Sequence, residues 1–70
     1  SCYMAIKPGQ NVRARNQLNL SVAEDEAPLI VIKEGDILVA ADEADEQGFQ
    51  SFTHLNTQFT NIRLHQDDVI

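Results

Sequence analysis

The alternation of apolar and polar residues along the chain predicts β-strands. Residues 11–15 alternate, with Val12 and Ala14 on one face, which is the period of a half-buried strand. Residues 29–32 and 37–41 are short apolar runs rich in β-branched side chains. Such runs are too short for helices and are typical of strands.

Turn residues separate these strands. Pro8-Gly9 precedes the first strand, and this pair favours a tight turn because proline presets φ and glycine accepts a positive φ. Residues 33–36 separate the two apolar runs, and we expect a tight turn there with Gly35 at its special position.

The middle and the second half of the chain contain further extended segments. Residues 16–28 are mostly polar, and we expect a long loop in which Leu18, Leu20 and Val22 form an edge that packs against the protein. Residues 49–55 and 59–64 are predicted as two strands of a hairpin. Phe49 and Phe52 are three residues apart, so a regular strand points them to opposite faces, unless a bulge turns both inward.

The end of the chain completes the predicted fold. Residues 65–68 are expected to form a short turn, and Val69-Ile70 a closing strand. About five short strands and no long amphipathic helix predict an all-β fold, a small five-stranded antiparallel barrel with a short 3-10 turn before the last strand. The 70 residues suffice for one domain over residues 1–70, in which residues 1–6 are expected to be flexible or in part an expression remnant.

The segment Ile32-Lys33-Glu34-Gly35-Asp36-Ile37-Leu38 resembles the diverging turn of SH3-like small barrels, with its Gly-Asp pair between hydrophobic residues. The opening Lys7 to Arg13 is similar to the first strand of bacterial and plastid barrels such as the small barrel protein of photosystem I and the variable chain of ferredoxin-thioredoxin reductase. The resemblance implies an SH3-like barrel of this type. It does not imply recognition of proline-rich peptides, because the chain has no tryptophan and its one tyrosine, Tyr3, lies outside the expected groove.

Composition narrows the class of protein. The formal net charge is -6, which argues against direct binding to nucleic-acid phosphates or to an anionic membrane surface. No apolar run approaches the length of a membrane-spanning helix. The single cysteine, Cys2, and the lack of a visible export signal in the printed sequence lead us to expect a cytoplasmic protein.

Charge is distributed unevenly along the sequence. Before Glu24 the chain contains three basic residues and no acid, and every acidic residue follows. One interpretation is a docking surface with a basic and an acidic face, in which Arg13 and Arg15 contact a partner. The other is that these arginines and Arg63 pair with carboxylates on neighbouring strands.

The acidic cluster at residues 42–46 is a candidate cation site. It contains four carboxylates, and carboxylate oxygens are ligands for calcium or magnesium. The cluster does not have EF-hand spacing, since Ala44 stands at position three and Thr53 replaces the bidentate glutamate of position twelve. We therefore expect a solvated loop rather than a dedicated metal site.

The sequence indicates no catalytic centre. His54, His65 and Cys2 are far apart in the chain, and nothing places a base, an orienting group and oxyanion donors together with a nucleophile. His54 is expected to be a surface or partly packed side chain. No glycine-rich phosphate loop is present, so no cofactor is predicted.

These observations predict a non-catalytic interaction module or accessory subunit that binds a protein partner through its loops and a charged face. One alternative is an acidic nucleic-acid mimic, of the phage or mobile-element type, that inhibits a DNA- or RNA-processing enzyme. Another is a weak divalent-metal-binding domain, and self-association into a homo-oligomer stays open. The residues predicted to contact a partner are Arg13, Arg15, Glu24, Asp25, Glu26, Asp42, Glu43, Asp45, Glu46 and Phe49.

Overall fold

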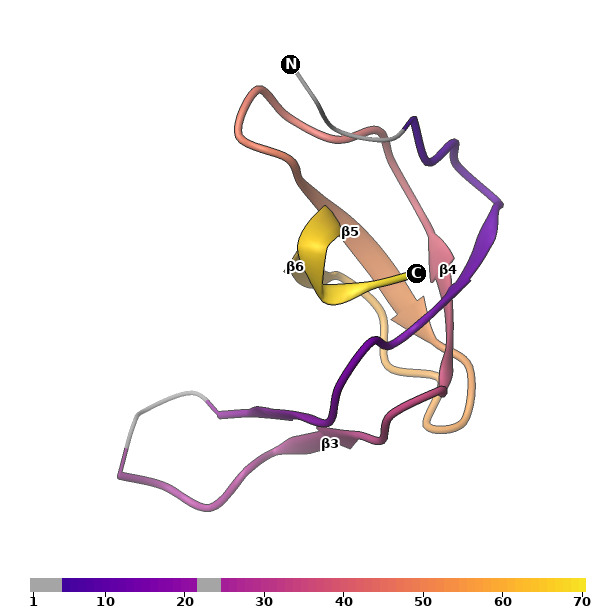
Figure 1. The fold of residues 1–70 in the computed structure, drawn as a ribbon. Helices are drawn as coiled ribbons and strands as arrows, with labels where there is room; N and C mark the ends of the chain where they lie inside the picture. The colour runs from indigo at the N-terminus through magenta and orange to yellow at the C-terminus, as the bar shows by residue number, and fades with distance from the viewer. Residues whose placement is uncertain (1–4, 22–24) are drawn as a thin grey trace.

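The computed structural model describes residues 5–21 and 25–70, and these residues form an all-β fold (Figure 1). This confirms the predicted fold class. The elements are β1 (Asn11–Arg13), β2 (Leu18–Leu20), β3 (Ile30–Ile32), β4 (Ile37–Ala40), β5 (Phe49–His54), β6 (Ile62–His65) and one 3-10 helix, η1 (Gln66–Asp68). No helix in the described part of the chain is long and apolar enough to cross a membrane.

The strands belong to two sheets. The first has the order β1-β4-β5-β6, and the second consists of β2 and β3, with every neighbouring pair antiparallel. The prediction of five strands in one closed barrel is therefore wrong. The physical reason lies in the turn at residues 33–36, because β3 and β4 on either side of it pair with different partners.

The strand that the sequence did not predict is β2, which lies in the segment that was expected to be a loop. Leu18 pairs with Ile32 and Leu20 with Ile30, so β2 and β3 form a two-stranded sheet. Leu18 and Leu20 also pack against the core, as their two-residue spacing predicted. Val22, the third member of that pattern, lies outside the described residues.

The connection between β5 and β6 is longer than the sequence predicted. β5 ends at His54 and β6 begins at Ile62, so residues 55–61 replace the expected three-residue hairpin loop. Gln58 and Asn61 have φ values of 62° and 58°. This left-handed conformation interrupts an extended strand, which explains why β6 does not begin at residue 59.

The predicted turns and the predicted 3-10 helix are present. Gly35 has a φ of 84° and the amide of Asp36 donates to the carbonyl of Lys33 at 3.0 Å, as in a type II turn. After η1 the chain returns to β1, since Ala14 forms a bridge with Val69. The amide of Ile70 donates to the carbonyl of Arg13 at 2.8 Å.

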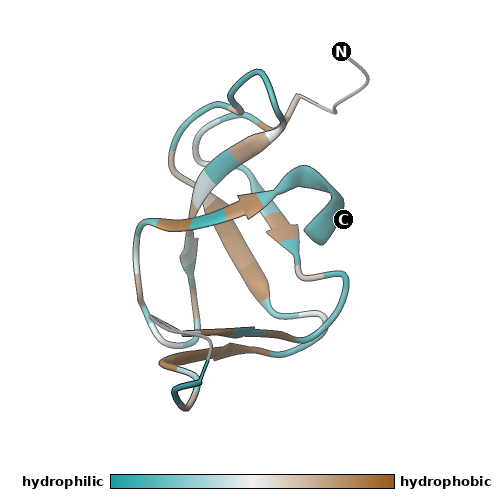
Figure 2. Cartoon of the chain, turned by 90° about the vertical axis from the view of Figure 1, so that its left-hand side faces the viewer, coloured by the Kyte–Doolittle hydropathy of each residue, from teal (hydrophilic) through white to brown (hydrophobic). Residues whose placement is uncertain are grey.

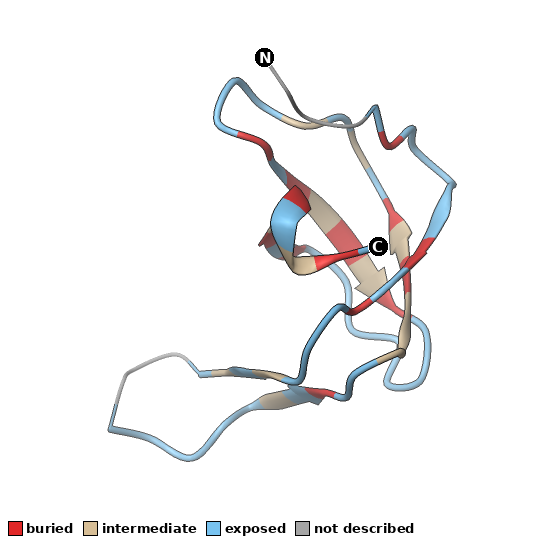
Figure 3. Cartoon of the chain, in the orientation of Figure 1, coloured by how far each residue is buried: buried red, intermediate tan, exposed pale blue. Residues whose placement is uncertain are grey.

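The apolar core lies between β1, β3, β4, β5 and β6 (Figures 2 and 3). In β5 the buried side chains alternate as Gln50, Phe52 and His54, so this strand contributes two polar groups to the interior. Phe49 is on the exposed face of the same strand, which confirms the prediction for a regular strand. The buried apolar residues are Ile6, Val12, Ala14, Ile32, Leu38, Ala40, Phe52, Ile62, Leu64 and Val69.

Candidate functional site

The two-stranded sheet projects from the rest of the molecule (Figure 1). We call this feature the β-arm and define it as residues 18–20 and 25–32. Its inner face is held at the base by Ile32, which is fully buried, and by Ile30, which packs against the core. Its outer face presents Leu29 and Val31, whose exposed fractions are 64% and 42%. Two large apolar side chains therefore face solvent on an element that extends beyond the core.

The turn at the base of the β-arm is held by β1 and the residue after it. The amide of Gly35 donates to the carbonyl of Ala14 at 2.8 Å, and the amide of Ala14 donates to the carbonyl of Asp36 at 2.9 Å. The guanidinium of Arg13 donates to the carbonyl of Gly35 at 2.8 Å. These three bonds fix the direction in which the β-arm leaves the body.

The same turn is held from the opposite side by His54. The imidazole is only 1% exposed, and its Nε2 lies 2.8 Å from Oδ2 of Asp36. Its Nδ1 lies 2.8 Å from Oγ1 of Thr57. Oδ2 of Asp36 also accepts a hydrogen bond from the amide of Lys33 at 2.9 Å. This amide, and next the imidazole, hold the pKa of Asp36 below its ordinary value of 3.8.

A hydroxyl, an imidazole and a carboxylate in this order are also the parts of a nucleophilic triad. Here the imidazole of His54 is enclosed, and its two nitrogens contact Oγ1 of Thr57 and Oδ2 of Asp36. The arrangement joins the turn at residues 33–36 to the connection at residues 55–61. The expectation that His54 is a surface or partly packed residue is wrong, because β5 turns every second side chain toward the interior.

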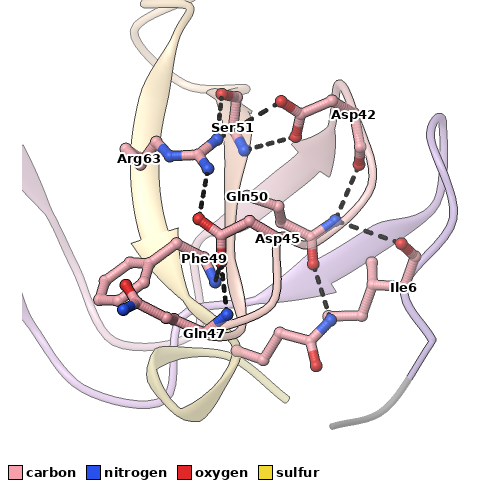
Figure 4. Close-up of polar contacts among 9 residues, drawn as sticks. Ile6, Asp42, Asp45, Gln47, Phe49, Gln50, Ser51 and Arg63 are labelled. Carbon is pink, nitrogen blue, oxygen red and sulfur yellow. Dashed lines mark hydrogen bonds and ion pairs between the residues drawn. The ribbon is translucent and has the colours of Figure 1, made fainter. Parts of the chain in front are cut away.

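A second polar cluster orders the acidic loop between β4 and β5 (Figure 4). The guanidinium of Arg63 lies 2.8 Å from Oδ2 of Asp45 and 3.5 Å from Oδ2 of Asp42. Oδ1 of Asp45 accepts from the amides of Gln47 and Phe49 at 2.9 and 3.0 Å. The amide of Phe49 is the main cause that keeps the pKa of Asp45 below 3.8. This carboxylate therefore shapes the loop.

Beneath this loop lies a buried pair of glutamines. Nε2 of Gln50 donates to the carbonyls of Asp42 and Ile6 at 2.9 and 3.2 Å (Figure 4). Oε1 of Gln50 accepts from Nε2 of Gln66 at 2.9 Å. Ile6 thus belongs to the packed structure, although the sequence placed it in a flexible terminal segment. Nothing in the sequence pattern of β5 distinguished Gln50 from an exposed polar residue.

The arginines that were predicted to bind a partner contact the protein itself. Arg13 donates to the carbonyl of Gly35, and Arg15 donates to the carbonyls of Asp67 and Val69 at 3.0 and 3.2 Å. The alternative, in which they pair with carboxylates, describes neither residue. It does describe Arg63. The partners are backbone carbonyls because the turn and the C-terminal segment lie beside residues 13–15.

The predicted acidic residues separate into distinct groups. Asp25 and Glu26 are exposed on the β-arm, and Glu24 lies outside the described residues. Asp42 and Asp45 contact Arg63, whereas Glu43 and Glu46 are exposed in the same loop. The two acidic segments lie at opposite ends of the molecule (Figure 1). They do not form one continuous stripe of charge.

Phe49 and the histidines complete the predicted candidates. Phe49 packs edge-to-face against His65, with ring centroids 4.9 Å apart. Nε2 of His65 lies 2.8 Å from the carbonyl of Gln47.

Among residues 5–21 and 25–70, no three histidine, cysteine, aspartate or glutamate side chains gather in an arrangement that suits a metal ion.

Comparisons with family models, with curated proteins and with solved structures find no match to this chain.

Proposed function

We propose that this protein is a non-catalytic interaction module that binds a protein partner through the β-arm. The observation on which the proposal rests is that Leu29 and Val31 are exposed on an element that projects from the core. Contiguous exposed apolar surface marks protein contact sites, and Leu29 and Val31 are two residues apart on the outer face of the β-arm. The hydrogen bonds that Ala14, Arg13 and His54 make to the turn at the base of the β-arm support this role, because a preorganised surface loses less entropy on binding.

The loop between β4 and β5 is a weaker candidate for the same role. Its carboxylates at positions 42 and 45 are occupied by Arg63 and by backbone amides. The alternative function of a nucleic-acid mimic is less well supported than binding through the β-arm. A mimic needs carboxylates in an extended array that follows the spacing of phosphates, and the two acidic segments of this protein lie apart (Figure 1). The alternative of weak metal binding is not supported by any cluster of three or more metal-ligating side chains among the described residues.

We also propose that the fold is related to SH3-like domains, although its sheets do not form a closed barrel. What supports this is the order of the elements: β1, the β-arm, a Gly-Asp turn, the β4-β5-β6 meander, and a 3-10 helix before a segment that returns to β1. A shared fold would not by itself define a partner.

Site-specific photocrosslinking tests the proposed function. A photoreactive phenylalanine analogue replaces Val31 in one sample and the exposed Thr60 in the control sample, and both are irradiated in an extract of the cells that produce this protein. We expect the analogue at position 31 to form a protein adduct of one defined mass and the analogue at position 60 to form none. An excess of unmodified protein should prevent formation of this adduct. The proposal would be contradicted by an adduct that forms equally at both positions. It would also be contradicted if no adduct at position 31 is suppressed by unmodified protein.

A further inference from the structure

The β-arm has free backbone edges. β2 and β3 pair with each other, and within the described residues neither pairs with another strand. An unpaired strand edge presents amides and carbonyls that a further strand is able to bind. Soluble proteins commonly block an exposed edge with charged residues, with proline or with a very short strand. β3 has no charged residue and no proline within its three residues, and Pro28 and Lys33 lie before and after it.

The side chains of β3 favour the addition of a strand beside it. Val31 faces solvent while Ile32 is buried, so the exposed face of β3 offers an apolar side chain next to its free edge. A strand added there would place its own alternate side chains against Val31 and Leu29. The backbone supplies the hydrogen bonds, and these two residues supply the apolar contact.

The charge of the β-arm restricts the occupant. The β-arm contains Asp25 and Glu26 and no basic residue, and Lys33 and Glu34 follow it at its base. A second copy of this chain would bring a net charge of -6 against the same charge, which opposes association. A segment with lysine or arginine between apolar residues complements the β-arm in both charge and hydrophobicity.

We infer that β3 binds an extended, basic segment of a partner protein, which adds to the β-arm as a third strand. This inference rests on the proposed function and deepens it by giving the chemistry of the partner. The basic side chains of the segment would lie near Asp25, Glu26 and Glu34, which are exposed. Its apolar side chains would cover Leu29 and Val31. This mode of recognition is strand addition to a sheet edge.

The probe for the experiment is a capped heptapeptide of alternating valine and lysine, added to the isotope-labelled full chain and followed by amide chemical shifts and hydrogen exchange. Two control peptides are matched to it: one has proline in place of the central valine, and one has glutamate in place of every lysine. We expect saturable shifts centred on residues 29–32 together with slower exchange of amides of β3. The proline peptide removes a backbone donor, and the glutamate peptide reverses the charge, so both should bind at least about tenfold more weakly.

Two protein variants separate strand addition from general electrostatic attraction. Val31→Lys changes an exposed side chain on β3, and Leu55→Lys makes the same charge change at a residue that is 49% exposed outside the β-arm. Both sites are on the surface, so both variants should keep the circular dichroism spectrum of the parent. We expect Val31→Lys to weaken peptide binding by about tenfold and Leu55→Lys to have a much smaller effect.

Several results would overturn the inference. These are shifts centred on β6 or on residues 41–48, equal binding of the proline peptide, equal effects of the two variants, or no shift at millimolar peptide. A specific crosslink from position 31 together with such a result would leave the interaction module standing and refute the basic strand as its partner. Peptide binding at β3 without any specific crosslink would refute the proposed cellular role instead.

Discussion

Nε2 of His54 lies 2.8 Å from Oδ2 of Asp36, and this contact joins the end of β5 to the turn at the base of the β-arm. The neutral ring satisfies both neighbours when Nε2 donates to Asp36 and Nδ1 accepts from the hydroxyl of Thr57. The protonated ring also satisfies them, with both nitrogens donating. The imidazole therefore joins the turn at residues 33–36 to the connection at residues 55–61.

Replacement of His54 by alanine should destabilise the protein strongly. The variant leaves a cavity beside the core and removes a ring partner from Asp36 and from Thr57, and we expect it to lower the free energy of unfolding by about 2–4 kcal/mol. Urea denaturation followed by circular dichroism measures this change. Thr60→Ala, at an exposed position in the next connection, should change the stability by less than about 0.5 kcal/mol. Equal stability of the two variants would show that the buried imidazole contributes nothing.

The carboxyl groups of Asp36 and Asp45 should make the protein sensitive to acid. The folded state lowers the pKa of both carboxyl groups below 3.8. Between the folded and the unfolded pKa of each group, the unfolded state therefore binds more protons than the folded state. Their contribution to stability is therefore present above the unfolded pKa and is lost as the pH falls through the folded pKa.

Thermal unfolding between about pH 2 and pH 6 tests this dependence. Asp36→Asn and Asp45→Asn should each reduce the loss of stability on acidification. Glu43→Gln, an exposed carboxylate of the same loop as Asp45, serves as the control and should keep the slope of the parent protein. If all three variants retain that slope, the lowered pKa values do not contribute.

Gly35→Ala should cost stability because of backbone conformation alone. The φ of Gly35 is 84°, and a Cβ there would meet no atom within 4 Å. We expect a loss of about 1–2 kcal/mol, since an L-residue is strained in this region. Gly35→Asn should lose less, because asparagine tolerates a left-handed conformation better than alanine. Chemical denaturation of the two variants decides this, and an alanine variant as stable as the parent would exclude the strain.

The two buried glutamines should differ in their effect on stability. Gln50→Leu leaves the carbonyls of Ile6 and Asp42 and the amide of Gln66 without their partner, and we expect a loss of about 3 kcal/mol. Gln66→Leu leaves only Oε1 of Gln50 without its donor, and it also removes Oε1 of Gln66, a buried oxygen with no hydrogen-bond partner among the described residues. Its loss should be about 1 kcal/mol. A larger effect of Gln66→Leu than of Gln50→Leu in urea denaturation would refute this account.

The extended segments and their turns follow from short stretches of sequence. The alternation at residues 11–15, the β-branched run before Gly35 and the glycine at its positive φ are local features, because each depends on the side chains and dihedral angles of a few neighbouring residues. The same local rule predicted that Phe49 and Phe52 lie on opposite faces. It also predicted the short turn that becomes η1.

Long-range contacts, by contrast, specify which strands pair and which polar groups are buried. Periodicity does not record partners, so it could not show that residues 18–20 pair with β3 or that β3 and β4 enter different sheets. It could not distinguish Gln50 and His54 from exposed polar residues, because their burial is made possible by the carbonyls, the carboxylate and the hydroxyl that arrive from distant segments. For the same reason the sequence did not predict that Arg13 and Arg15 donate hydrogen bonds to backbone carbonyls. These pairings bring residues together across the whole chain, and only the folded arrangement specifies them.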